Sequence, residues 1–235
     1  MHALAALLLL ASASAPLAAP AVEDARCPLP PSSGGPAALV GTFPPPGSAD
    51  AAADLAVVLW EQRTRTPDEV SRALAEEQLS LEDYAAVLGT TFDVARHPLT
   101  DALLARAMAA SRPCVAAAKG AHRRPRPYAA DGRVRPAVPP EPTASFPSGH
   151  ATRGALLAAV LAELAPDRRE AVLARGAQIG HDRVIAGVHY PSDVAAGEKL
   201  GLAVAEALLA DPAFRAELER VRASEWKAPP AAGAP

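Results

Sequence analysis

Two histidines of this chain stand in patterns that could prepare an imidazole for reaction. The first closes the stretch "SFPSGH", and an apolar run, "ATRGALLAAV", follows it at once. This pattern predicts a helix whose amino end carries Ser148, Gly149 and His150. Free N–H groups and the positive end of the helix dipole attract an anion there. We expect Gly149 to let an oxyanion approach, Ser148 to donate to it, and His150 to donate a proton. A plain Ser/His helix cap is the other interpretation.

The second histidine lies in "HDRVIAGVHYPSD", residues 181–193. Pro191 predicts that a new helix begins just after His189, which places this histidine in a turn. Asp193 follows four residues later, where its carboxylate can hold one ring nitrogen and leave the other free to attack. Arg183 precedes His189 by six residues and adds a cation. The other interpretation is a structural His–Asp pair.

A basic stretch, "KGAHRRPRP", occupies residues 119–127 of a chain whose net charge is −3. Arg126 stands between two prolines, which hold its backbone extended. Lys119 lies near the expected end of the preceding helix. A fixed guanidinium beside a lysine suits a phosphate dianion. A solvated basic loop or a nucleic-acid patch is the alternative, but the negative net charge gives nucleic acid no overall attraction.

The elements that must position these groups are helical. The chain has 235 residues, of which 50% are hydrophobic, enough for one domain with a full core. Capping residues precede apolar runs of helical period, and no run of alternating β-branched residues occurs. We expect helices over 48–63, 66–77, from Ser80, from Thr100, over 150–164, from 167 towards Gly187, from Pro191, and over 211–223. The fold class is therefore predicted to be all-α, a single compact bundle over residues 48–223.

The two ends of the chain carry other signals. Residues 1–21 hold a short apolar core followed by small residues, typical of a signal peptide cleaved before Val22. The run is too short to span a bilayer, so no membrane anchor is expected after cleavage. Residues 22–47 are rich in Pro and Gly and are expected to form an extended arm. Residues 224–235 are expected to be a disordered tail. The mature protein is predicted to be periplasmic or secreted.

Cys27 and Cys114 are the two cysteines of the chain, and both follow the expected cleavage site. Export favours a disulfide between them, with a structural and not a catalytic role. No metal-type spacing surrounds either cysteine.

Taken together, three motifs resemble a family signature. They are Lys119-x6-Arg126-Pro127, Pro147-Ser148-Gly149-His150 and Arg183-x5-His189-x3-Asp193. This set resembles the signature of the type 2 phosphatidic-acid-phosphatase superfamily, which also contains the vanadium-dependent haloperoxidases. Among its members the chain is most similar to the bacterial class A non-specific acid phosphatases, which are secreted, soluble and all-helical.

The resemblance implies a role for each residue. His189 would attack phosphorus and form a phosphohistidine, with Asp193 orienting it. His150 would protonate the leaving alcohol and later activate water. The residues expected to bind the phosphoryl oxygens are Lys119, Arg126, Ser148, Gly149 and Arg183. No metal or other cofactor is implied, the expected partners are small phosphate monoesters, and a homo-oligomer is compatible with the sequence.

Two positions depart from the family pattern. Asp182 stands where the signature has serine, and we expect it to pair with Arg183, fixing the direction of that side chain and weakening its charge towards phosphate. Phe146 stands where tyrosine is frequent, which removes one hydroxyl near the mouth of the site. The loop over residues 128–144 is expected to border the pocket.

Four rival functions are compatible with parts of the pattern. A metal-dependent phosphohydrolase would use His181, Asp182, His150 and Asp193 as ligands, but the neighbouring cations disfavour a metal ion there. A vanadate-dependent haloperoxidase would use the same anion pocket. A lipid-phosphate phosphatase is disfavoured because, after the expected signal peptide, charged residues interrupt every long apolar stretch and no spanning helix is expected. A non-catalytic anion-binding protein would need a degenerate site, whereas every position of the signature is occupied.

Overall fold

The computed structural model describes residues 26–90 and 92–226, and no strand occurs among them. The predicted all-α fold class is confirmed. The α-helices are α1 (Gly35–Val40), α2 (Ala49–Thr64), α3 (Pro67–Ala75), α4 (Ala85–Leu88), α5 (Pro98–His122), α6 (Pro127–Ala130), α7 (Gly149–Leu164), α8 (Arg169–Ile185), α9 (Pro191–Ala210) and α10 (Pro212–Glu225). Short 3-10 turns occur at Pro31–Ser33, Leu81–Tyr84, Val94–Arg96 and Pro166–Arg168. No helix in the described part combines the length and apolarity that crossing a bilayer demands.

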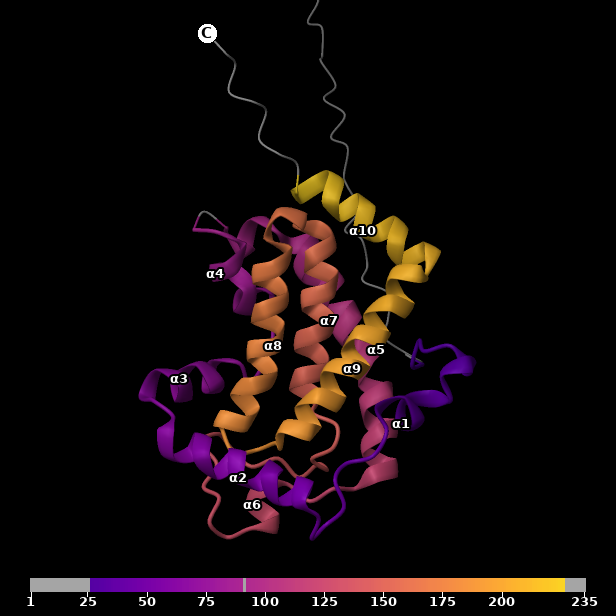
Figure 1. Cartoon of the computed structure of the whole chain (residues 1–235). Helices are drawn as coiled ribbons and strands as arrows, with labels where there is room; N and C mark the ends of the chain where they lie inside the picture. The colour runs from indigo at the N-terminus through magenta and orange to yellow at the C-terminus, as the bar shows by residue number, and fades with distance from the viewer. Residues whose placement is uncertain (1–25, 91, 227–235) are drawn as a thin grey trace, which may run out of the picture.

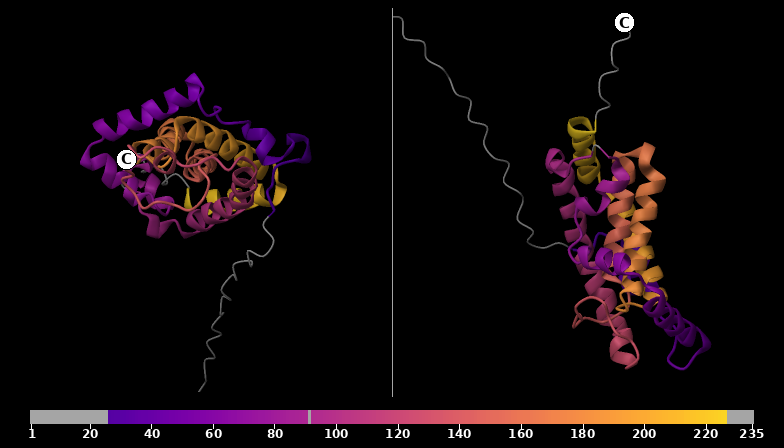
Figure 2. Two further views of the ribbon diagram at one scale, coloured as in Figure 1. Left: turned by 90° about the horizontal axis from the view of Figure 1, so that it is seen from below. Right: turned by 90° about the vertical axis from the view of Figure 1, so that its left-hand side faces the viewer.

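Four long helices build the bundle. In Figure 1, α5 descends, α7 rises, α8 descends and α9 rises, because short turns connect α7, α8 and α9. α10 lies across the upper end, whereas α2 and α6 lie at the lower end. Seen from below, α2 runs along one side of the bundle (Figure 2). The lower end therefore gathers the end of α5, the start of α7 and the turn between α8 and α9.

Glycines let the three consecutive helices approach closely. A Cβ atom on Gly197 of α9 would collide with the Ser148 carbonyl oxygen, which stands at the start of α7. A Cβ on Gly154 of α7 would lie 2.7 Å from the Gly176 carbonyl oxygen of α8, closer than real contacts allow. Leucines such as Leu156, Leu161 and Leu200 fill the core between the helices. This close contact fixes the start of α7 relative to the start of α9.

Capping explains why several helices begin where the sequence predicts. The Ser48 hydroxyl accepts a hydrogen bond from the Ala51 amide at the start of α2. Thr66 and Glu69 form a capping box at the start of α3. The element predicted from Ser80 begins as a 3-10 turn and continues as the four residues of α4, which end at Gly89, whose φ is 128°.

The start of α5 was predicted incorrectly. The helix begins at Pro98 and not after Thr100. The carboxylate of Glu225, in α10, accepts hydrogen bonds from the Leu99 and Thr100 amides at 2.7 and 2.9 Å. The acceptor that caps this helix therefore comes from a residue distant in sequence, which a local pattern does not reveal.

The Pro-rich arm also differs from the prediction. Within residues 22–47, expected to be extended, residues 31–33 form a 3-10 turn and α1 follows. Val40 is buried, and Leu39 packs on the core, so tertiary contacts stabilise a helix despite the local composition. A disulfide joins Cys27 to Cys114 of α5, with the Cα atoms 4.9 Å apart. The predicted signal peptide, residues 1–21, lies outside the described residues.

The chain's carboxyl end is helical further than expected. α10 continues to Glu225, two residues into the predicted tail, and Trp226 packs on the core. Residues 227–235 lie outside the described part.

Candidate active site

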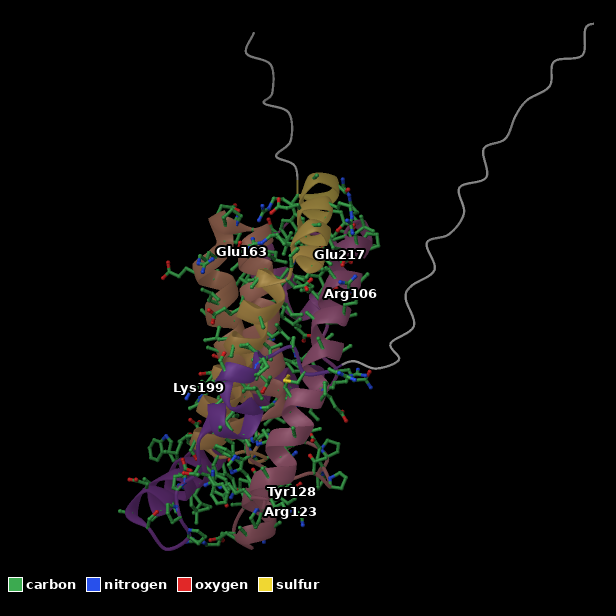
Figure 3. The ribbon with its side chains drawn as sticks, turned by 90° about the vertical axis from the view of Figure 1, so that its right-hand side faces the viewer. Arg106, Arg123, Tyr128, Glu163, Lys199 and Glu217 are labelled. Atoms are coloured by element: carbon green, nitrogen blue, oxygen red, sulfur yellow. A yellow bond between two sulfur atoms is a disulfide. The ribbon has the colours of Figure 1, made fainter. Side chains whose placement is uncertain are left out.

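A cavity of about 250 Å³ opens at the lower end of the bundle. Its wall includes Lys119, Glu141, Thr143, Gly149, His150 and His189. In Figure 3, Tyr128 and Arg123 mark this end of the molecule, and Arg106, Glu163 and Glu217 mark the opposite end. The two histidines predicted to act together therefore face the same cavity. Glu141 and Thr143 come from the 128–144 loop, which borders the pocket as predicted.

His189 lies in the turn between α8 and α9 and is 1% exposed. Its Nδ1 lies 3.4 Å from the Asp193 Oδ2 atom and 3.4 Å from the Ser145 hydroxyl. Its Nε2 accepts a hydrogen bond from Arg126 Nη1 at 3.2 Å. Asp193 thus orients the ring through Nδ1, and Nε2 is the nitrogen left to face a reacting group, in the arrangement that the sequence suggested.

Asp193 is itself held on every side. Its Oδ2 atom accepts hydrogen bonds from the Ser145 hydroxyl at 2.5 Å and the Tyr190 amide at 2.9 Å. Its Oδ1 atom accepts one from Arg124 Nη1 at 2.7 Å. Burial works to raise the pKa of Asp193, but the contacts with His189, Arg124 and Ser145 outweigh it and the pKa is lowered. The carboxylate therefore stays ionised and keeps one orientation.

Burial also keeps His189 neutral. It lowers the pKa of His189 to about 4, although the hydrogen bond and charge of Asp193 act to raise the pKa. The positive charges of Arg126 and Lys119 also lower it. A neutral imidazole keeps a lone pair for attack in mildly acidic solution, where an ordinary histidine is largely protonated.

His150 occupies the first turn of α7 and is 6% exposed. Its Nε2 lies 3.3 Å from the Glu77 carbonyl oxygen, and that acceptor requires the proton on Nε2. Its Nδ1 lies 3.5 Å from Arg153 Nη2. Burial, together with the charges of Arg183 and Arg153, lowers the pKa of His150 well below its usual value. The protonated form expected from the sequence therefore needs a bound anion to offset these cations.

Ser148 and Gly149 begin α7. The Ser148 hydroxyl accepts from the Ala151 amide at 3.3 Å, and the residue is fully buried, so it serves as the helix cap. Gly149 lines the cavity, and an added Cβ would meet nothing closer than 3.7 Å. The protein's own atoms would therefore tolerate a side chain at residue 149. The glycine matters only for an anion that approaches the backbone within the space that a Cβ would occupy.

Of the two predicted phosphate ligands in the 119–127 stretch, Lys119 lines the cavity, whereas Arg126 lies behind the wall in contact with His189. The Lys119 ammonium donates to the Ala144 carbonyl oxygen. Burial, with Arg126 nearby, lowers the pKa of Lys119 to about 8. Arg126 has the extended backbone predicted for it, with φ −71° and ψ 155°.

The Arg126 guanidinium is fully engaged. Besides His189, it donates to the carbonyl oxygens of Thr143 and Val188, at 3.0 and 3.2 Å. It also donates to the Thr143 hydroxyl at 2.9 Å and to the Glu141 carboxylate at 2.7 Å. Glu141 therefore occupies one side of a cation that the sequence assigned to phosphate.

The expected pairing of Asp182 with Arg183 is wrong. Neighbouring residues on a helix point about 100° apart, and the two side chains diverge. Asp182 accepts two hydrogen bonds from Arg72 of α3, both at 2.8 Å. Arg183 donates to the Glu76 carboxylate at 2.9 Å and to the Ala73 carbonyl oxygen, and its Nε has no hydrogen-bond partner among the described residues. Glu76, and not Asp182, holds the arginine.

The rival metal set does not come together. His181 lies 3.3 Å from Glu61 and is half exposed, whereas Asp182 is fully buried against Arg72. In residues 26–90 and 92–226, no group of three or more His, Cys, Asp or Glu side chains is arranged to hold a metal ion.

Sequence reasoning missed several residues of this site. Ser145 and Arg124 fix Asp193, Glu141 engages Arg126, and Glu76 holds Arg183. Arg112 and Arg153 line the cavity itself. A helical spacing could have indicated the last two, because Arg153 is one turn after His150 and Arg112 is two turns before Lys119. The acidic residues carry no comparable signal.

Comparison with known proteins agrees with this geometry. Residues 101–216 match the model of the PAP2 superfamily. This part of the chain is a PAP2 superfamily domain. It contains every residue of the three motifs that form the candidate site.

Individual relatives match over part of their length. The acid phosphatase of Zymomonas mobilis is 35% identical over 159 residues, which cover 66% of this chain and 60% of that protein. The non-specific acid phosphatase of Salmonella typhimurium is 45% identical over 78 residues, 33% of this chain and 31% of that protein. The chain thus spans less than two thirds of either relative. 

A solved structure shares the PAP2 fold. It is a transmembrane PAP2 type phosphatidylglycerolphosphate phosphatase from Bacillus subtilis, with a TM-score of 0.53 at 21% identity. The match covers 74% of this chain and 89% of that one.

Proposed function

We propose that this protein hydrolyses phosphate monoesters through a phosphohistidine on His189, as a broad-specificity acid phosphatase. One observation carries the proposal: His189, His150 and Lys119 line the same cavity of about 250 Å³. The PAP2 domain and relatives named acid phosphatase support it.

In the first step, His189 Nε2 attacks phosphorus, and the bond from phosphorus to the ester oxygen breaks. Arg126 Nη1 must release Nε2 and turn to a phosphoryl oxygen, where it joins Lys119. Asp193 stabilises the positive charge that develops on the ring. The departing alkoxide takes a proton from His150, which the bound phosphate dianion has kept protonated.

In the second step, His150 takes a proton from water, and the oxygen attacks phosphorus. The bond from phosphorus to His189 Nε2 breaks, and inorganic phosphate leaves. Cations around the phosphoryl group stabilise the transition state in both steps. No step requires a metal ion.

The intermediate is the sharpest test. The enzyme would be mixed briefly with 4-nitrophenyl phosphate, denatured at alkaline pH, where the phosphoramidate bond survives, and digested for mass spectrometry. We expect an added phosphate on His189. His189→Ala should lose both the adduct and most of the turnover, and a variant with near-normal turnover would exclude His189 as nucleophile.

The role of the cations can be tested separately. Lys119→Met should lower kcat/KM by on the order of a hundredfold, the usual cost of losing one oxyanion donor. Turnover in the presence of a chelator tests the metal-independent mechanism, because inactivation that added metal reverses would contradict it.

Lipid phosphates are the second candidate substrates, suggested by the lipid-phosphate name of the similar solved structure. A water-soluble short-chain phosphatidic acid and 4-nitrophenyl phosphate, compared by kcat/KM, would distinguish the two. We also propose export to the periplasm or the medium, which amino-terminal sequencing of the secreted protein would test.

A further inference from the structure

Two arginines of the cavity wall have no acidic partner. Arg112 lies on the exposed face of α5, and Arg153 lies on α7. Neither forms a salt bridge within the described residues, and the hydrogen bond of Arg153 is the long contact of 3.5 Å with His150. The carboxylate of this wall, Glu141, lies 2.7 Å from Arg126 instead.

The proposed mechanism does not use these two arginines. That mechanism assigns Lys119 and Arg126 to the transferred phosphoryl group, and the family resemblance adds Arg183, so Arg112 and Arg153 exceed what one phosphate dianion needs. Burial lowers the pKa of Arg153, and the charge of Glu141, which is itself paired with Arg126, offsets this only in part. A guanidinium kept beside a cavity without a counter-ion is suited to an anion that arrives with the ligand.

The position of Arg153 says where that anion belongs. Arg153 contacts His150 Nδ1, the nitrogen left free by the Glu77 carbonyl, and His150 serves the leaving group in the proposed reaction. Arg153 therefore lies on the leaving-group side of the phosphoryl position, and Arg112 lines the same cavity close enough for its charge to act on Arg153.

We propose that Arg112 and Arg153 form a second anion subsite that binds a carboxylate or a second phosphate on the leaving group. The preferred substrates are then phosphate monoesters that carry another negative charge. This inference rests on the proposed function for the orientation of the substrate, but the subsite itself can be tested by binding alone.

The test compares two non-hydrolysable ligands, 4-carboxybenzylphosphonate and its neutral amide, by calorimetry. The unchanged protein should bind the carboxylate on the order of tenfold more tightly, the scale of one hydrogen bond between charged groups. The preference should fall in Arg112→Gln and in Arg153→Gln and vanish in the double variant. Arg220→Gln, on the exposed face of α10, is the matched control for net charge and should keep the preference.

The readout is the ratio of the two dissociation constants for each variant. A variant that is partly misfolded weakens both ligands alike, so this ratio changes only if the preference for the carboxylate changes. Arg112 is exposed, so its replacement leaves the core intact. Equal affinities in the unchanged protein, or a preference that survives in the double variant, would overturn the subsite. Turnover of 4-nitrophenyl phosphate is measured beside it, so that a failure of the proposed function is recognised separately.

Discussion

At the scale of single residues, two buried imidazoles have different neighbours, which suit the opposite tasks proposed for them. His189 has a carboxylate at Nδ1, whereas His150 has a carbonyl oxygen at Nε2 and an arginine at Nδ1. Both pKa values are lowered when the cavity is empty. A bound dianion lies between the two rings in the proposed reaction, so its negative charge can favour the protonated form of His150 while Nε2 of His189 bonds to phosphorus.

The pH dependence of kcat/KM follows from His189 and Lys119. His189 loses its nucleophilic lone pair as pH falls through about 4. Lys119 loses its charge as pH rises through about 8. We expect a bell-shaped profile with limbs near these values, after correction for the second ionisation of the ester. Lys119→Arg should move the alkaline limb to higher pH, because a guanidinium stays charged there; an unmoved limb would mean that another group sets it.

Anion binding should carry a proton to His150. Near pH 6, about half a unit below the usual pKa of histidine, the lowered pKa leaves His150 neutral in the empty site. Molybdate binding should therefore be accompanied by proton uptake, measured by calorimetry in buffers of different ionisation enthalpy. His150→Ala should bind molybdate without that uptake. Equal proton uptake in both proteins would assign it to another group.

At the scale of elements, α3 and the residues at its end contact site residues without lining the cavity. The residue that follows its last turn, Glu76, accepts a hydrogen bond from Arg183, and the carbonyl oxygen of the next residue, Glu77, contacts His150. One turn earlier, within α3, Arg72 donates two hydrogen bonds to Asp182 of α8. This short helix and the two residues after it thus contact the proposed phosphate ligand Arg183 and the proposed proton donor His150, although none of them lines the cavity.

Removing Glu76 should therefore affect both stability and turnover. Glu76→Ala leaves Arg183 without its carboxylate and also takes the 2.7 Å partner from Arg175. The expected loss of unfolding free energy is about 3 kcal/mol, as for other broken buried pairs. Denaturant unfolding measures that loss, and kcat/KM should fall as well. Glu77→Ala is the control, because its contact with His150 uses the backbone carbonyl.

The helices themselves were largely predictable, whereas their contacts were not. Caps at Ser48, Thr66 and Ser148 lie beside the amides they serve, so a local pattern finds them. The cap of α5 comes from Glu225, which only the folded chain brings there. The three site motifs could be found because each lies within one short segment and their spacings resemble a family signature, although each segment crosses a helix end. The partners of Asp182 and Arg183 could not be predicted, because they are Arg72 and Glu76, which lie in α3 and at its end and are distant in sequence.

At the scale of the whole molecule, the disulfide attaches the amino-terminal arm to the bundle. Cys27 and Cys114 are 87 residues apart, and Cys114 is fully buried in α5. Closing so long a loop restricts the unfolded chain, which accounts for about 4 kcal/mol in the chain-entropy model. Neither cysteine lines the cavity, so the bond contributes to stability and not to the reaction.

Replacing both cysteines by alanine should lower the unfolding free energy by about 4 kcal/mol. Turnover of the folded fraction at low temperature should change little. Denaturant titration of the oxidised protein and the double variant measures the difference. Reduction of the unchanged protein should reproduce it, and a negligible difference would show that the arm adds no constraint to the unfolded state.

The fully hydrogen-bonded guanidinium of Arg126 affects how tightly the proposed site can hold inorganic phosphate, the product. Every N–H of this side chain already has an acceptor, so an arriving phosphoryl oxygen exchanges one partner for another. In the proposed reaction, Arg126 therefore adds little to the affinity for inorganic phosphate and contributes mainly in the short-lived pentavalent state. We expect weak product inhibition, measured as the inhibition constant of inorganic phosphate.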